Sequence, residues 1–101
     1  MPHPMRMFAQ KKKFTVADNT TYPFVFDPSG AIGADFGKAV VSVNVQEAKN
    51  GRNAPLQCCW SYEAAKTLAV FVFDDNGVEL VPADVGWTGR TVEIHVIAAE
   101  S

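Results

Sequence analysis

The chain has 101 residues, of which 48% are hydrophobic and 20% are charged. That length suits one domain, able to bury roughly two-thirds of its unfolded surface, and the composition is that of a folded globular protein. The formal net charge of -2 argues against a basic field for nucleic acid. No apolar run approaches the ~18 residues that a membrane-spanning helix needs.

The first ten residues, MPHPMRMFAQ, precede the only run of like charge, Lys11–Lys13. They lack the charged start and following apolar stretch of a secretory signal, so we expect no export as a precursor. They also leave no room for a regular element before the lysines. We therefore expect residues 1–10 to form an extended arm and residues 11–101 to form a single β-sandwich domain.

Alternation of apolar and polar residues predicts most of the strands. In chain order the candidate strands are Lys13–Ala17, Tyr22–Asp27, Ala39–Val45, Leu56–Tyr62, Lys66–Asp74, Val78–Val81 and Thr91–Ala98. Pro23 restricts the second of these to a sheet edge or to the start of a strand. Asn76-Gly77 predicts a type I′ hairpin turn between the fifth and the sixth. Six to seven short strands separated by turns predict an all-β fold, either an antiparallel sandwich or a small barrel.

Two adjacent cysteines, Cys58 and Cys59, lie within the strand pattern Leu56–Tyr62. Alternation puts Cys58 on the apolar face of that strand and Cys59 on the opposite face. We therefore expect Cys58 to be buried and reduced, and neither cysteine to bind metal. A zinc site needs wider cysteine spacing and further ligands, and His3 and His95 are distant in sequence. The apolar face of this strand also carries Leu56, Trp60 and Tyr62.

The segment Lys66–Asp74 differs from the others because both of its faces are apolar. Such a strand is either central and covered on both sides, or has one face buried by another chain. In the second case, Phe71 and Phe73 would belong to a partner interface.

The sequence shows no arrangement of residues that predicts a catalytic site. No G-x-S-x-G or comparable nucleophile motif occurs. His95 beside Glu93 is expected to be a solvated surface residue, and Asp74-Asp75 precede an Asn-Gly turn, where aspartates favour turn geometry. Gly30–Gly33 lacks the Lys-Ser/Thr that completes a phosphate loop. We therefore expect a protein that is not an enzyme and that has no cofactor.

Residues 68–97, LAVFVFDDNGVELVPADVGWTGRTVEIHVI, resemble a β-hairpin module of structural proteins of tailed bacteriophages. That module has a strand of the type V-x-V-[FY]-D, a Gly turn, a short strand ending in V-P-x-[DE]-[VI], and a closing T-V-x-I strand. The matching residues are Val70, Val72, Phe73, Asp74, Gly77, Val81, Pro82, Asp84, Val85, Thr91, Val92 and Ile94. The resemblance covers about a third of the chain. It implies a binding or assembly domain on the virion, without catalytic residues.

The resemblance leads to the expectation of a non-enzymatic virion structural protein, made in the host cytoplasm. The module usually ends a longer tail or fibre protein, whereas the length of this chain fits a capsid decoration protein that reinforces the assembled shell. Its partners would be phage capsid or tail subunits and further copies of itself, with no nucleic acid and no membrane. The expected interface residues are Met5, Met7, Phe8, Lys11, Lys12, Lys13, Phe71 and Phe73.

Two alternatives stay open. Lys11–Lys13 either protects an edge strand against unwanted pairing or contacts an acidic partner. The protein as a whole is either a virion component or a small binding module that recognises carbohydrate or protein, including a tail- or fibre-associated domain. In the second case, exposed aromatic residues such as Trp87 and Tyr22 would carry the recognition.

Overall fold

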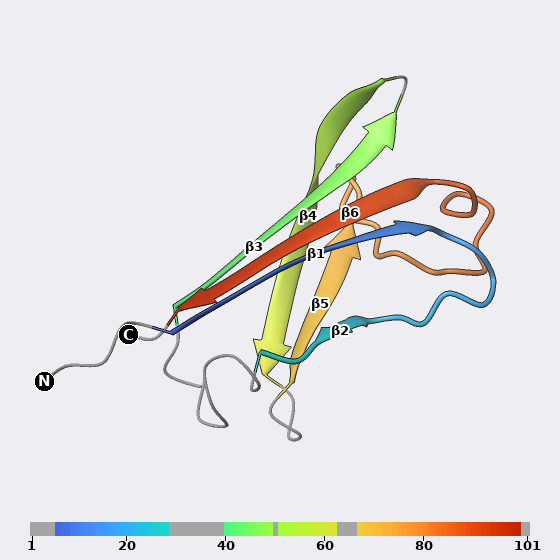
Figure 1. Ribbon diagram of the computed structural model, residues 1–101. Helices are drawn as coiled ribbons and strands as arrows, with labels where there is room; N and C mark the ends of the chain where they lie inside the picture. Colours follow the sequence, from blue (N-terminus) through green and yellow to red (C-terminus); the bar gives the residue numbers. More distant parts are fainter. Residues whose placement is uncertain (1–5, 29–39, 50, 63–66, 100–101) are drawn as a thin grey trace, which may run out of the picture.

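The computed structural model describes residues 6–28, 40–49, 51–62 and 67–99. Six antiparallel strands pair in the order β1-β6-β3-β4-β5-β2, and the sheet curls into a half-barrel (Figure 1). The strands are β1 (Met7–Thr15), β2 (Phe24–Phe26), β3 (Val40–Lys49), β4 (Arg52–Tyr62), β5 (Leu68–Phe73) and β6 (Thr91–Ala99). No helix occurs within the described ranges. The expected all-β antiparallel fold is therefore confirmed.

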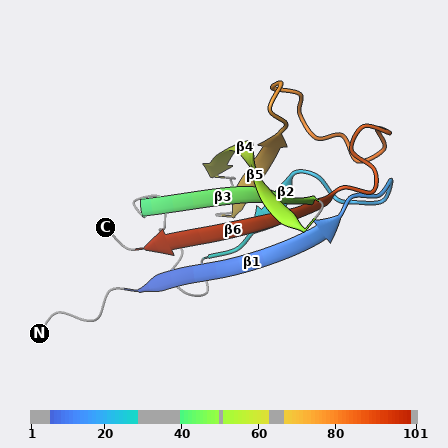
Figure 2. The ribbon, with the colours of Figure 1, turned by 90° about the horizontal axis from the view of Figure 1, so that it is seen from above.

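The sheet consists of two three-stranded halves, β1-β6-β3 and β4-β5-β2, which the β3–β4 hairpin joins. This hairpin pairs over five positions, from Val45↔Leu56 to Lys49↔Arg52. Before Val45 the described residues of β3 pair only with β6, and after Leu56 those of β4 pair only with β5. The halves therefore diverge from the hairpin, and β4 and β5 run across the direction of β3, β6 and β1 (Figure 2).

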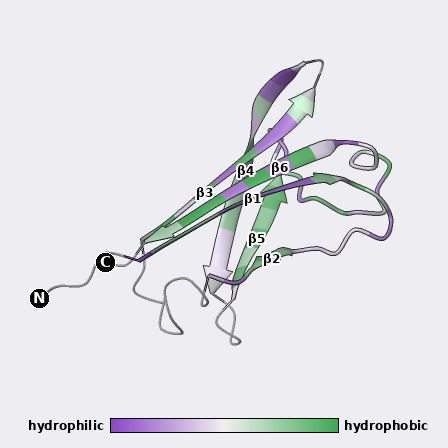
Figure 3. Ribbon diagram, in the orientation of Figure 1, coloured by the Kyte–Doolittle hydropathy of each residue, from purple (hydrophilic) through white to green (hydrophobic). Residues whose placement is uncertain are grey.

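The core lies between these two halves. Three alternate side chains of β6 and three of β5 are fully buried in one cluster, namely Val92, Ile94 and Val96 from β6 and Leu68, Val70 and Val72 from β5. Burying one such side chain stabilises the fold by roughly 1.5–3 kcal/mol. Strand β5 is mainly hydrophobic, whereas β1 is largely hydrophilic (Figure 3). The strand that pattern analysis marked as apolar on both faces is thus the centre of its half.

The two edges of the sheet are β1 and β2. Pro23 immediately precedes β2, which has only three residues. The restriction of this segment to a sheet edge or to the start of a strand is therefore confirmed, because a proline has no N–H to donate to a ladder.

The start of β1 differs from the expected extended arm. Met7–Gln10 continue β1, and Met7 pairs with Ala99 at the end of β6. Met7–Gln10 pair with β6, which lies near the other end of the chain, and a local sequence pattern cannot predict such pairing. Residues 1–5, including Met5, lie outside the described residues.

The hairpin after β5 is present, but its turn differs from the prediction. Gly77 N–H donates to Asp74 O at 3.0 Å, so Asp75 and Asn76 are the central residues, and Gly77 follows with φ 79°. Asp74 N–H donates to Val78 O at 3.0 Å, which makes a three-residue loop rather than a two-residue type I′ turn. The Asp74 carboxylate selects this loop by accepting hydrogen bonds from the backbone N–H groups of Asn76 and Val78, both at 2.9 Å.

The strand that returns from this turn is shorter than predicted. Among the described residues, Val78–Val81 pairs with β5 through one isolated bridge, Phe73↔Glu79. A hydrogen bond from Leu80 N–H to Val72 O, at 2.9 Å, extends the contact. Pairing of the two segments is confirmed, and a full second strand is not.

Candidate functional site

The three lysines of Lys11–Lys13 do not form one basic patch, because alternation along β1 separates them. Lys11 and Lys13 are exposed on the outer face, whereas Lys12 is half-buried on the inner face. The Lys12 ammonium donates to Val25 O at 3.1 Å and lies 4.6 Å from the centroid of the Phe26 ring. Lys12 therefore links β1 to β2.

Phe14 completes this link. Its ring stacks on Phe24 of β2, with centroids 4.6 Å apart. Among the described residues no register pair joins β1 to β2, so side chains close the half-barrel here. We call the contacts of Lys12 and Phe14 with Phe24–Phe26 the β1–β2 seam. A groove of about 340 Å³ lies over the seam, lined by Lys12, Phe14, Thr20, Thr21, Pro23, Phe24 and Val25.

The outer face of β1 and β6 carries an exposed apolar patch. The register places Met7 opposite Ala99 and Ala9 opposite Ile97, so Met7 and Ile97 are diagonal neighbours. Met7 is 58% exposed and Ile97 is 45% exposed. We call these four residues the β1–β6 patch.

A charged strip adjoins the β1–β6 patch. Lys11 lies opposite His95, and Lys13 lies opposite Glu93. His95 Nε2 is 2.7 Å from Glu93 Oε1, and this hydrogen bond, helped by the two lysines, lowers the pKa of Glu93 below its ordinary value of 4.5. The expectation of a surface position for His95 is confirmed, since its side chain is 39% exposed.

The two cysteines lie on opposite faces of β4, as expected. Cys59 is exposed, and Cys58 packs against the core with its thiol directed at Val43 O, 3.8 Å away. Cys58 is only half-buried, because β3 and β4 have already diverged at this level. The partial burial still raises the pKa of the Cys58 thiol. Trp60, on the same face, is also more exposed than a core position predicts.

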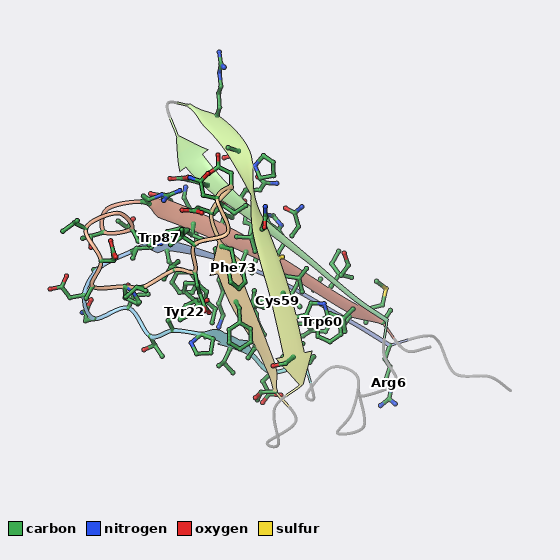
Figure 4. The ribbon with its side chains drawn as sticks, turned by 180° about the vertical axis from the view of Figure 1, so that it is seen from behind. Arg6, Tyr22, Cys59, Trp60, Phe73 and Trp87 are labelled. Carbon is green, nitrogen blue, oxygen red and sulfur yellow. The ribbon has the colours of Figure 1, made fainter. Side chains whose placement is uncertain are left out.

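The outer face of β5 carries Phe71 and Phe73, both half-buried. Cys59 of β4 lies opposite Phe71 in the register, and Cys59 and Phe73 lie along neighbouring strands (Figure 4). The Tyr22 ring meets Phe71 edge-on, with centroids 6.3 Å apart. This face is therefore partly covered by the protein's own Tyr22.

Tyr22 serves the fold as well. Its hydroxyl donates to Glu79 Oε2 at 2.7 Å and accepts from Val72 N–H at 3.0 Å. Val72 lies past the residues of β5 that pair with the short strand β2. Its backbone N–H still needs an acceptor, which the Tyr22 hydroxyl provides. Burial, together with the hydrogen bond to Glu79, raises the pKa of Tyr22 well above its ordinary value of 10.

A polar cluster that pattern analysis missed closes the core near the hairpin. Arg90 Nε and one terminal nitrogen donate to the two carboxylate oxygens of Glu47, both at 2.7 Å. The guanidinium lies 4.1 Å from the centroid of the Trp87 ring. Glu47 is only 7% exposed and Trp87 only 2%. The expectation that Trp87 is an exposed recognition residue is therefore wrong, because Arg90 and the core cover it.

An open polar pocket of about 620 Å³ adjoins this cluster. Its walls include Glu47, Arg90 and the Asp74–Asn76 turn. The acidic groups are already engaged, since Glu47 binds Arg90 and Asp74 accepts two turn N–H groups. An acidic residue at an inward position of β3 was the one sign of this ion pair in the sequence. Its partner could not be predicted, because Arg90 lies 43 residues away.

The expected interface residues thus fall into separate places. Met7, Lys11 and Lys13 share the outer face of β1, while Phe8 and Lys12 face inward from the same strand. Phe71 and Phe73 lie on the outer face of the other half of the sheet, and Met5 is outside the described residues.

Comparison of the chain with protein-family models, curated proteins and solved structures gives no significant match. The resemblance to phage modules therefore stays a prediction. Within the described ranges, no group of three or more His, Cys, Asp and Glu side chains is placed to hold a metal ion. Those ranges also contain no helix that is long and apolar enough to cross a membrane.

Proposed function

We propose that the protein is a non-enzymatic binding protein that docks on a larger ordered assembly through the β1–β6 patch. The observation that supports this most directly is the exposure of Met7 and Ile97, which are diagonal neighbours on the outer face of the sheet. Contiguous exposed apolar patches mark interaction sites, and burying the exposed half of each of these two side chains would stabilise a contact by roughly 1 kcal/mol. Lys11 and Lys13 beside the patch favour an acidic partner surface.

The more specific form of the proposal is a structural protein of a tailed-phage virion, in the manner of a capsid decoration protein. The resemblance of residues 68–97 supports it. The first strand, the Gly turn and the closing strand of the pattern fall on β5, Gly77 and β6, whereas its short strand is reduced to a single bridge at Glu79. A small patch suits such a role, because a contact repeated over symmetric copies gains from the effective concentration that neighbouring contacts supply.

The test measures binding to particles purified on a density gradient from cells that carry the gene. We expect the wild-type protein to sediment with the particles, and the double variant Met7→Ser with Ile97→Ser to stay in the soluble fraction. The matched control changes Val78 and Val81 to Ser, since these are 54% and 50% exposed but lie in the β5–β6 connection. Loss of binding in both double variants, or in neither, would contradict docking through the β1–β6 patch. A wild-type protein absent from the particles would contradict the virion role.

The two aromatic residues named for the alternative, Trp87 and Tyr22, do not favour recognition through exposed aromatic side chains. Trp87 is buried under Arg90, and the Tyr22 hydroxyl has both a donor and an acceptor partner within the protein.

A further inference from the structure

The groove over the β1–β2 seam combines a cation with aromatic walls. We propose that it binds a small organic anion, namely a carboxylate or similar singly charged head attached to a flat ring or a short alkyl chain. The site lies on the inner side of β1, opposite the β1–β6 patch, and does not depend on the docking function.

Lys12 supplies the charge. An ammonium has three N–H donors, and the Lys12 ammonium uses one of them on Val25 O. Its other contact is the face of the Phe26 ring, which attracts the cation without consuming a donor as a hydrogen bond to oxygen would. No carboxylate of the described residues pairs with it. The hydrogen bond of this ammonium to Val25 O is exposed, so an anion can reach the cation from outside and form a charge-assisted hydrogen bond with it.

The walls select the body of the ligand. Phe14 and Phe24 form a stacked pair, and Pro23 adds an apolar surface beside them. The groove volume of about 340 Å³ lies at the lower end of the ~300–1,000 Å³ range of small-molecule sites, so a single ring or a short alkyl chain suits it. Thr20 accepts a hydrogen bond from Ala17 N–H at 2.9 Å, and its own O–H remains as a donor at the rim.

Binding here has a structural consequence. A ligand in the groove contacts β1 through Lys12 and Phe14, and the β2 side through Phe24 and Val25. It would therefore tie together the two sheet edges, which no backbone pairing joins within the described ranges. A ligand that binds the folded protein alone raises the unfolding temperature as its concentration rises.

Nuclear magnetic resonance titration tests the proposal, with benzoate and hexanoate as probes and with benzyl alcohol and hexanol as uncharged controls. We expect benzoate to shift the amide signals of Phe14, Thr20, Thr21 and Val25, and those of Ile97 to stay unchanged. Because a charge-assisted hydrogen bond is lost, benzyl alcohol should bind about tenfold more weakly or worse.

Three variants locate the charge. Lys12→Met should weaken benzoate binding about tenfold or more, and Lys12→Arg should keep it within a few-fold. Lys13→Met is the matched control, one position along β1 but on the outer face, and should bind as the wild type does. The proposal is overturned if the Lys12→Met protein binds benzoate as tightly as the wild type. Should that variant fail to fold, the wild type still decides, since equal affinity for the acid and the alcohol, or shifts outside the groove, would overturn it as well.

Discussion

The two halves of the half-barrel are joined on one side by a backbone ladder and on the other by side chains. The β3–β4 hairpin pairs over five positions, and its hydrogen bonds join main-chain groups that most single substitutions leave in place. The β1–β2 seam rests on Lys12 and Phe14 from one edge and on Phe24–Phe26 from the other. A single substitution should therefore affect the seam much more than the ladder.

Both sides also place a cation over an aromatic ring, but with different partners. At the hairpin side, Arg90 covers Trp87 and is held by the two oxygens of Glu47. At the seam, Lys12 covers Phe26, and among the described residues its hydrogen-bond acceptor is the carbonyl oxygen of Val25. The first cation is neutralised within the fold, whereas the second keeps its charge for a ligand.

The largest effect is expected from Phe24→Ala. Phe24 is buried, and its ring forms the apolar part of the seam with Phe14. Removing it leaves a cavity and should lower the free energy of unfolding by ~3 kcal/mol, as measured by urea denaturation. The control at the ladder is Asn53→Ala, at an exposed position opposite Ala48, with an expected change within ~0.5 kcal/mol. A loss below ~1 kcal/mol for Phe24→Ala would mean that the seam does not hold the halves together.

The next largest effect is expected from Arg90→Met, which removes the guanidinium that binds both oxygens of the nearly buried Glu47 carboxylate. We expect the free energy of unfolding to fall by ~2–3 kcal/mol, less than for a fully buried pair because the Arg90 side chain is 28% exposed. Arg52→Met at the exposed hairpin tip is the control and should change stability by less than ~0.5 kcal/mol. Adding Glu47→Gln to Arg90→Met should recover part of the loss. Additive losses would show that the two side chains do not act as a pair.

Much of the fold could be predicted from local patterns. Alternation located β6 and the hydrophobic face that it turns to the core, and Pro23 restricted the β2 segment to a sheet edge or to the start of a strand. The turn at Asn76-Gly77 was located but its type was not, because the outcome depends on hydrogen bonds that the Asp74 carboxylate makes. The separation of Lys12 from Lys11 and Lys13 also follows from alternation, because adjacent side chains of a strand point to opposite faces.

The rest of the candidate site depended on contacts between distant parts of the chain. Met7 belongs to β1 because Ala99 pairs with it, and no local feature of either residue indicates the other. The same holds for Glu47 and Arg90, which are 43 residues apart in the sequence. Trp87 was expected on the surface because it lies among turn residues, but the turn folds back and buries its ring beneath Arg90.

A smaller effect is expected from Tyr22→Phe, which tests how the seam continues along β5. The change removes the acceptor of Val72 N–H and the donor to Glu79, so the free energy of unfolding should fall by ~1–2 kcal/mol at pH 7. Because burial and Glu79 raise the pKa of Tyr22 in the folded state, its neutral hydroxyl contributes stability below pH ~10. That contribution is lost as the pH rises through the folded-state pKa. The wild type should therefore lose its advantage over Tyr22→Phe above pH ~10, and a constant difference across that range would contradict the role of the hydroxyl.

Substitution of the two cysteines is expected to have the smallest effect on stability but a clear effect on thiol reactivity. Both cysteines follow Leu56, where the β3–β4 ladder ends. Cys59 is exposed, whereas Cys58 is half-buried with a raised pKa and lies where β3 and β4 have diverged. A thiol reagent at pH 8 should react in two phases, because the thiolate is the reacting form and the Cys58 thiol carries less of it. Cys59→Ala should remove the fast phase, and Cys58→Ala the slow one, with stability changes of about 0.5 kcal/mol or less for Cys59→Ala and ~1 kcal/mol for Cys58→Ala. If Cys58 reacts as fast as Cys59, the halves open at the hairpin side as readily as at the seam, and the contrast between ladder and side-chain closure fails.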